Sequence, residues 1–266
     1  MGTLDTFRLD GKVAIVTGGA RTLGYDMADA LAEAGCSLVI TSRELAKAEK
    51  SAERLRKERK VEVLPMGLDQ CQYPQVAEMA KRALAWKGRI DILINNAGGG
   101  TPGENCRFFE RAPEHMADLI ARNLTGVLYC CREVGKTMVK QRSGKIINIA
   151  SIAGMVGRDR RMYARGKLME QPPDYAAAKG GVISFTRDLA AILAPYGVYA
   201  NAISPGGFER GQPPEFIKAY SDATALGRMG RDGIDLKGAA LFLASPASDY
   251  VTGQNLAVDG GFCMFK

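Results

Sequence analysis

Short apolar runs alternate with amphipathic stretches along the chain, and this alternation limits the fold more than any other feature. The apolar run KVAIVT occupies residues 12–17, and the next stretch, LGYDMADALAEAG, has apolar residues at helical spacing. A short, continuous apolar run bounded by glycines is typical of a buried parallel strand. Strands that alternate with helices predict right-handed crossovers and a parallel sheet with helices on both faces.

The same pattern continues to the end of the sequence. We expect strands at 12–17, 37–42, 61–69, 91–100, 144–151, 198–207 and 254–261, and helices at 23–35, 44–60, 74–86, 113–142, 174–197 and 235–245. These elements predict an α/β fold with an open, doubly wound parallel sheet of about seven strands, in which ligands bind at the carboxyl ends of the strands. With no linker or internal repeat, we expect one domain over residues 1–266.

Composition and charge exclude several classes of protein. No apolar run approaches the length of a membrane span, and the start, MGTLDTFRLDGK, is too polar for a signal peptide. The six cysteines are scattered and form no CxxC motif, which predicts reduced thiols and a cytoplasmic location. The net charge of +7 comes without a basic helix that carries aromatic residues, so we expect a small anionic ligand and no nucleic acid.

The turn after the first strand has the composition of a phosphate-binding loop. It reads Thr-Gly-Gly-Ala-Arg-Thr-Leu-Gly over residues 17–24 and leads into the first helix. Glycines let the backbone approach a pyrophosphate, and the start of a helix offers free N–H groups. A plain tight turn is the alternative, but the position after the first strand favours a dinucleotide site.

From this point the sequence resembles the short-chain dehydrogenases/reductases almost end to end. The resemblance rests on the glycine turn, Asn95-Asn96-Ala97-Gly98, Asn123, Ser151, a Tyr-x-x-x-Lys motif, Pro205-Gly206 and TGQNLAVDGG at 252–261. It implies a Rossmann-like domain that binds a nicotinamide cofactor and holds no metal. The implied cofactor-binding residues are Gly18, Arg21, Thr22, Leu23, Gly24, Ser42, Arg43, Asp69, Gln70, Asn96, Gly98, Tyr175, Lys179, Pro205, Gly206 and Phe208.

Two features of the predicted cofactor site are specific to this chain. Thr22 stands where the family has its middle glycine, which places a Cβ beside the pyrophosphate path. Ser42 stands at the end of the second strand, where an acid would select NAD by binding the ribose 2′-hydroxyl. Arg43 and Arg21 are suited to bind a 2′-phosphate, so we expect NADP(H) to be preferred, with NAD(H) as the alternative. Asp69 is expected to contact the adenine or to cap a helix.

The Tyr-x-x-x-Lys motif occurs twice, at Tyr163–Lys167 and at Tyr175–Lys179. Helical spacing puts the phenol and the ammonium on one face. A continuous amphipathic helix follows Tyr175, whereas Pro172-Pro173 prevents a long helix after Tyr163. Tyr163 lies 12 residues after Ser151, near the family spacing, and Tyr175 lies 24 after it. We attribute the difference to an inserted basic loop at about 155–174 and predict that Tyr175 is catalytic.

The residue types indicate proton transfer coupled to hydride transfer. A nearby ammonium, about 4 Å away at an effective dielectric near 20, lowers the pKa of a phenol by about three units. The resemblance implies that Tyr175 transfers the proton, Lys179 lowers its pKa and holds the ribose, Ser151 binds the substrate oxygen, and Asn123 keeps a relay water in place.

The predicted insertion is basic, with five Lys or Arg residues and one Asp in 157–167. It leaves the strand that carries Ser151, so we hypothesise that Arg158 and Arg161 attract a substrate carboxylate or phosphate. A solvated loop or a subunit contact is the alternative. Arg210 stands where many relatives have a threonine near the cofactor, and it could also bind a substrate anion.

Similarity to the gluconate 5-dehydrogenase branch favours an enzyme that interconverts a secondary alcohol and a ketone on a sugar acid or related polyol. A reductase of 3-oxoacyl groups on acyl carrier protein shares the same motifs, and a non-catalytic member that senses NADP(H) or acts as a scaffold is the alternative from another class. The segment TGQNLAVDGG resembles the one through which relatives pair subunits, so we expect a homotetramer, with a dimer as the alternative.

Overall fold

The computed structural model describes residues 2–100, 105–168 and 170–265. Its central feature is a parallel sheet of seven strands in the order β3-β2-β1-β4-β5-β6-β9. The strands are β1 (Val13–Thr17), β2 (Ser37–Ser42), β3 (Val63–Gly67), β4 (Ile92–Asn95), β5 (Gly144–Ile149), β6 (Val198–Pro205) and β9 (Asn255–Val258). Chain order reverses between β1 and β4, and in doubly wound sheets this switch point holds the ligand.

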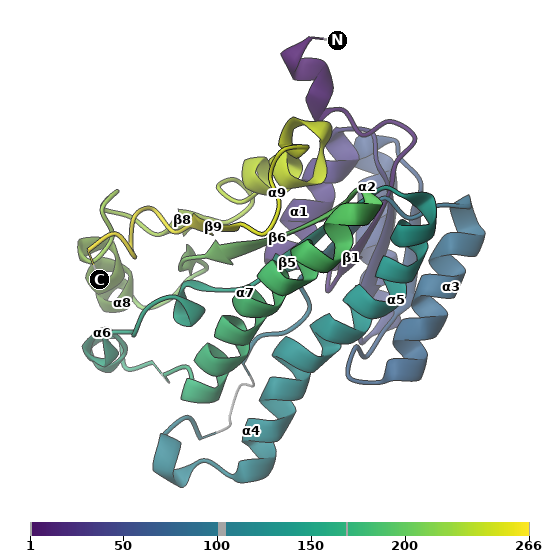
Figure 1. Cartoon of the computed structure of the whole chain (residues 1–266). Helices are drawn as coiled ribbons and strands as arrows, with labels where there is room; N and C mark the ends of the chain where they lie inside the picture. The colour runs from purple at the N-terminus through teal and green to yellow at the C-terminus, as the bar shows by residue number, and fades with distance from the viewer. Residues whose placement is uncertain (1, 101–104, 169, 266) are drawn as a thin grey trace.

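Helices cover both faces of the sheet, as the alternation predicts (Figure 1). The long helices are α1 (Thr22–Glu33), α2 (Leu45–Arg59), α3 (Tyr73–Lys87), α5 (Gly126–Gln141) and α7 (Pro173–Leu193), and the shorter ones are α4 (Pro113–Ile120), α6 (Arg160–Arg165), α8 (Pro214–Asp222) and α9 (Lys237–Ala244). None of the helices in the described residues is long and apolar enough to cross a membrane.

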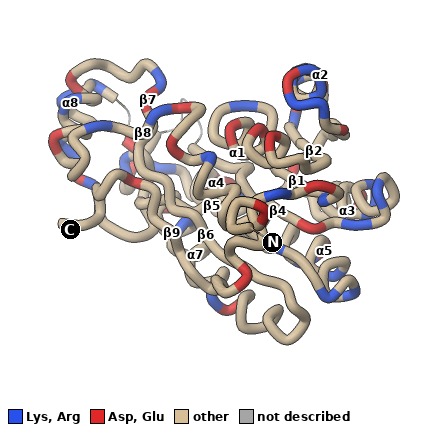
Figure 2. Tube along the Cα trace, turned by 90° about the horizontal axis from the view of Figure 1, so that it is seen from above, with Lys and Arg blue, Asp and Glu red and all other residues tan. Residues whose placement is uncertain are grey.

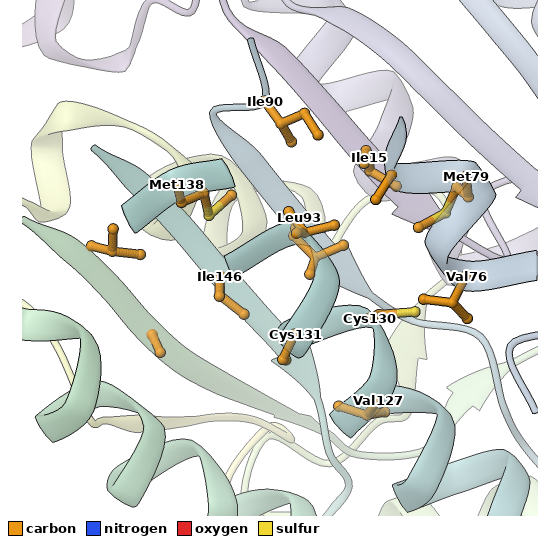
Figure 3. Close-up of a cluster of buried hydrophobic side chains, with 14 of the residues drawn as sticks. Ile15, Val76, Met79, Ile90, Leu93, Val127, Cys130, Cys131, Met138 and Ile146 are labelled. Atoms are coloured by element: carbon orange, nitrogen blue, oxygen red, sulfur yellow. The ribbon is translucent and has the colours of Figure 1, made fainter. Parts of the chain in front are cut away.

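Successive strand residues point to opposite faces and form two separate cores. Ile15, Val39 and Leu93 pack with α3, α5 and α7, whereas their neighbours in the same strands pack with α1, α2 and α9. Cys130 and Cys131 of α5 lie in the first core (Figure 3). Both faces of each central strand are therefore buried, which is why these strands read as continuous apolar runs.

Three regions differ from the expected elements. The predicted helix at 113–142 is α4 and α5 joined by a π-helical turn, Ala121–Thr125, which contains Asn123. The short helix α6 lies within the predicted insertion, and α8 lies between the expected strand at 198–207 and the expected helix at 235–245, where no element was predicted. A third, smaller core of Ile152, Met162, Phe216, Tyr220, Met229 and Phe262 joins α6 to α8 at the carboxyl end of the sheet.

Candidate active site

A cavity of about 1350 Å³ runs along the carboxyl ends of the strands. We call it the main cavity. One end lies between α1 and α2, and the other lies beside α6 and α8. Cavities for drug-sized ligands measure about 300–1,000 Å³, so this one has room for a dinucleotide together with a small substrate.

The glycine turn forms the floor of the main cavity at the switch point. Gly18 has φ +64°, and a Cβ on Gly24 would lie 2.2 Å from the carbonyl oxygen of Gly18 and 2.4 Å from Nδ2 of Asn96. Nδ2 of Asn96 donates to the carbonyl oxygens of Thr17 and Gly18, at 3.0 and 3.2 Å. The absence of a side chain at Gly24 thus allows the close contact with Gly18 and Asn96, and Gly24 does not line the main cavity.

The start of α1 faces this cavity with free backbone donors. Its N-cap residue, Arg21, forms no side-chain cap hydrogen bond. Arg21, Thr22 and Leu23 line the cavity. An exposed helix N-terminus beside a glycine turn is suited to a pyrophosphate, so these residues fit a dinucleotide.

Thr22 adopts a backbone conformation that favours glycine. Its φ is +48°, in the left-handed region, although the residue is β-branched. The turn geometry therefore explains why relatives have glycine here, and the threonine carries the strain.

Basic side chains surround the end of the main cavity next to β2. Ser42 and Arg43 line it, as predicted, together with Arg21 from the glycine turn. The sequence analysis missed three further lining residues on the cavity side of α2: Lys47, Lys50 and Arg54. Figure 2 shows basic and acidic residues mixed along α2, so charge alone did not mark which face turns inward.

Asp69 and Gln70 line the neighbouring wall. The carboxylate of Asp69 accepts from the backbone N–H of Cys71 at 3.0 Å, and the N-cap position of α3 belongs to Gln72, so Asp69 does not cap that helix. Nε2 of Gln70 donates to the carbonyl oxygens of Ala97 and Arg122, at 3.0 and 2.6 Å. Gln70 thereby ties the loop after β4 to the π-helical turn.

Asn123 is fully buried and does not line the main cavity. Its Oδ1 accepts from the N–H of Gly99 at 2.7 Å, and its Nδ2 donates to the carbonyl oxygens of Gly99 and Leu119, each at 3.0 Å. Both amide protons are thus used within the protein. The side chain is placed to shape the loop after Gly98, and the relay water stays a prediction.

Ser151, Tyr175 and Lys179 meet at the centre of the main cavity. Ser151 follows β5, whereas Tyr175 and Lys179 are one turn apart at the start of α7. The Ser151 side chain lies near the Tyr175 phenol and lowers its pKa. Nζ of Lys179 donates to the carbonyl oxygen of Ile149 at 2.7 Å and lies 5.8 Å from the centre of the Tyr175 ring.

The electrostatics of this group differ from the sequence-based expectation. Burial raises the pKa of Tyr175, while the Ser151 hydrogen bond and the positive charge of Arg158 oppose the rise. Burial lowers the pKa of Lys179 to about 8. The positive charge of Arg158, a residue predicted only to bind the substrate, thus also lowers the pKa of the Tyr175 phenol.

Tyr163 also lines the main cavity, but it lacks a paired lysine. It lies in α6, which ends at Arg165, and Lys167 has φ +49°, outside the helical conformation. The ring of Tyr163 packs against Phe216 of α8, with ring centres 5.4 Å apart. The structure thus gives the phenol–ammonium arrangement to Tyr175 and an aromatic packing position to Tyr163.

The remaining predicted residues separate into two groups. Asn96, Gly98, Pro205, Gly206, Arg158 and Arg210 line the main cavity. Phe208 does not, because its ring is buried in the core next to α9. Arg161 does not either: its side chain is 82% exposed and pairs with Asp159 at 2.8 Å. Arg210 pairs with Asp232 at 2.6 Å, so its charge is already compensated.

Comparisons with known proteins agree with this architecture. The family model described as enoyl-(acyl carrier protein) reductase matches residues 18–263. Cyclohexanol dehydrogenase of Rhodococcus sp. (strain TK6) is 34% identical over 97% of this chain and 98% of that protein. The 2-dehydro-3-deoxy-D-gluconate 5-dehydrogenase of Dickeya dadantii (strain 3937) is 35% identical over 97% of this chain and 98% of that protein.

A solved structure gives the same likeness in three dimensions. It is a gluconate 5-dehydrogenase from Burkholderia cenocepacia J2315 in complex with NADP and tartrate. That protein is 36% identical to this chain, with a TM-score of 0.88 and coverage of 99% of both chains.

Proposed function

Because the chain belongs to the short-chain dehydrogenase/reductase family and is an NAD(P)-dependent oxidoreductase acting on CH–OH groups, we propose that it uses NADP(H) to interconvert a secondary alcohol and a ketone on a small anionic substrate. The observation that carries the proposal is that Ser151, Tyr175 and Lys179 line the same cavity as the glycine turn.

We assign the proton transfer to Tyr175. When bound, the nicotinamide supplies or accepts the hydride. In the reduction direction, the Tyr175 phenol donates its proton to the substrate oxygen, and the Ser151 hydroxyl holds that oxygen by a hydrogen bond. Since burial raises the pKa of Tyr175, the phenol is protonated at neutral pH and ready to act as a donor. Lys179 is placed to hold the cofactor ribose from the start of α7.

The preference for NADP(H) is supported by the charges next to β2. Arg21, Arg43, Lys47, Lys50 and Arg54 line that end of the main cavity. Glu44 is the nearby acid, and it pairs with Lys47 at 2.6 Å. Ser42 presents a hydroxyl where an NAD-selective enzyme presents a carboxylate. The local charge therefore favours a 2′-phosphate over a free hydroxyl.

The cofactor assignment is tested by direct binding of NADPH and NADH at equal ionic strength. Replacing Arg43 by Gln should weaken NADPH about 10- to 100-fold and leave NADH unchanged, since hydrogen bonds to charged groups contribute about 1.5–3 kcal/mol. Lys57→Gln is the matched control, because Lys57 lies on α2 and does not line the main cavity. Equal affinity of the unaltered protein for both nucleotides would contradict the preference.

An acid is the substrate class that we propose. The names of the relatives make sugar acids the first candidates, and the lining of the main cavity narrows this class in the next subsection. The relatives from Dickeya dadantii and Burkholderia cenocepacia are both named as dehydrogenases of gluconate-type acids, and the solved structure of the second one is a complex with NADP and tartrate. Turnover of aldonates but not of the matching neutral polyols would support this class. Turnover confined to 3-oxoacyl groups on acyl carrier protein would favour the alternative, and NADPH binding without any hydride transfer would favour a sensor or scaffold.

We further propose that subunits pair through β9, as expected for a homotetramer. This strand is the edge of the sheet in the described residues, and Leu256 on it is 37% exposed. An uncovered edge strand with apolar residues is a natural surface for self-association. Sedimentation of the protein against a Leu256→Lys variant tests the pairing, and an unchanged oligomer would contradict it.

A further inference from the structure

The substrate end of the main cavity combines one unpaired cation with an apolar wall. Its lining comes from the segment 157–168 and from α8, which lie side by side (Figure 1). This end holds the space next to Tyr175 that a substrate would occupy. The inference below rests on the proposed function and narrows the substrate class of the same site.

The guanidinium of Arg158 is fixed in position without an ion pair. Its Nη2 donates to the carbonyl oxygens of Gln171 and Pro172, at 3.0 and 3.4 Å, and its Nη1 donates to Oε1 of Gln171 at 3.4 Å. The N–H of Tyr175 donates to the same Pro172 oxygen at 3.1 Å, so Arg158 is anchored at the start of the helix that carries Tyr175.

Two N–H groups of Arg158 remain for a ligand. An arginine has five N–H donors, and within the described residues neither Nε–H nor the second N–H of Nη1 has a hydrogen-bond partner. These two donors point to different edges of the planar group, so each can donate one separate hydrogen bond, and the positive charge with one of these donors can hold a carboxylate oxygen. No acidic residue among those described pairs with Arg158.

The other charges at this end of the main cavity are already compensated or directed elsewhere. Arg210 and Asp232 pair with each other at 2.6 Å. Lys179 is buried and directs its Nζ to the carbonyl oxygen of Ile149. Arg158 is therefore the charge that a substrate anion would meet.

One wall at this end of the main cavity is aromatic and aliphatic. Tyr163, Leu168, Phe216 and Met229 line the cavity, and they belong to one apolar cluster. Gly166 allows α6 to sit this close to α8, since a Cβ there would lie 2.6 Å from Cβ of Phe216. The nearby amide of Gln212 is occupied, because it donates to the Phe208 carbonyl oxygen and accepts from the Arg210 N–H.

We propose that the substrate is an amphipathic hydroxy or keto acid, whose carboxylate binds Arg158 and whose apolar ring or chain lies against Tyr163, Leu168 and Phe216. In the reduction, the carbonyl carbon gains a hydride from the reduced nicotinamide and the oxygen gains the Tyr175 proton. The ketone becomes an alcohol, the nicotinamide is oxidised, and the carboxylate is unchanged. A polyhydroxylated acid would bury hydroxyls against the carbon atoms of Leu168, Phe216 and Met229, which offer no hydrogen-bond partner, and this is unfavourable.

Binding of a non-reacting acid tests the site without turnover. We expect calorimetry to show cyclohexanecarboxylate binding at least about 10-fold more tightly than cyclohexanemethanol, and Arg158→Gln to remove this difference. Arg158→Lys keeps the charge but not the anchored guanidinium, so it should retain part of the difference. Arg161→Gln, which changes an exposed arginine three residues away, should have no effect. Equal binding of the acid and the alcohol to the unaltered protein would overturn the anion site.

Rates with three ketones test the substrate class. We expect kcat/KM with NADPH to be highest for 4-oxocyclohexanecarboxylate. The values for 4-methylcyclohexanone and for 5-ketogluconate should both be lower than this value. Arg158→Gln should lower the value for the oxo acid about 10- to 100-fold more than the value for the neutral ketone. Equal losses for both ketones would assign Arg158 to the support of Tyr175, and a preference for 5-ketogluconate would refute the apolar wall.

These outcomes separate the inference from the proposed function. If no ketone is reduced while Arg158-dependent binding of cyclohexanecarboxylate persists, the oxidoreductase proposal fails and the anion site stands. If neutral ketones are reduced without Arg158-dependent binding of the acid, the oxidoreductase proposal stands and the anion site fails.

Discussion

Replacing Thr22 by glycine is expected to stabilise the protein, although it removes side-chain atoms. Thr22 has φ +48° and is exposed at the start of α1. A residue with a Cβ costs about 1–2 kcal/mol in this conformation. No described residue forms a hydrogen bond with the Thr22 hydroxyl, so the substitution removes no hydrogen bond within the described part of the protein.

The unfolded chain offsets part of this gain. A glycine raises the conformational entropy of the unfolded state, which costs about 0.4–1 kcal/mol. The net stabilisation is therefore about 0.5–1 kcal/mol, a rise in melting temperature of about 1–4 °C for a chain of this size. The urea midpoint, measured without nucleotide at a fixed protein concentration, gives the change in the free energy of unfolding.

Two controls separate backbone strain from other effects. Thr22→Ala keeps a Cβ, so it should give no comparable gain. Lys60→Gly should give a similar gain, because Lys60 is an exposed residue with φ +60° at the end of α2. A lower urea midpoint for Thr22→Gly, or an equal gain for Thr22→Ala, would refute the explanation by strain.

Other changes test the electrostatics of the site. Burial lowers the pKa of Lys179 to about 8, whereas a free lysine has a pKa of about 10.4. Between these two pH values the unfolded state binds more protons than the folded state, so the free energy of unfolding rises with pH. Lys179→Met should therefore raise the free energy of unfolding by about 1–3 kcal/mol near pH 7. This gain should vanish towards pH 10–11, and the variant should lose turnover. A gain that does not depend on pH in urea titrations would contradict the buried charge. Burial raises the pKa of Tyr175, so the phenol stays protonated and the rate of ketone reduction should stay constant around neutral pH. Alcohol oxidation needs the phenolate, so its rate should increase as the pH rises. Parallel pH profiles for the two directions would argue against Tyr175 as the proton carrier.

The sheet was predictable because its strands are buried on both faces. Residues such as Ile15 and Val16 pack on opposite sides, so each strand reads as an unbroken apolar run. All seven expected strands occur within their predicted ranges. Helix α8, in the stretch after β6, was not predicted. Its residues Phe216 and Tyr220, four residues apart, pack on the third core, and this core depends on the segment around α6.

The centre of the site was also predictable, whereas its surroundings were not. Helix continuity after Tyr175 and two prolines after Tyr163 distinguished the two tyrosines, and the structure places only the first of them on a helix with its lysine. The direction of a side chain depends on tertiary packing, which local sequence does not specify. For that reason Phe208 and Asn123 turn inward, Arg161 turns to solvent, and the inward face of α2 was missed.

Hydride transfer with variants of the two tyrosines tests the central claim most directly. Nicotinamide absorbance would be followed with NADPH and a ketone substrate for the unaltered protein, Tyr175→Phe and Tyr163→Phe. We predict that Tyr175→Phe lowers kcat about 10²- to 10⁴-fold, as expected for loss of a general acid, and that Tyr163→Phe keeps kcat within about threefold, since its packing on Phe216 needs no hydroxyl. Loss of turnover in Tyr163→Phe with Tyr175→Phe still active would contradict the assignment.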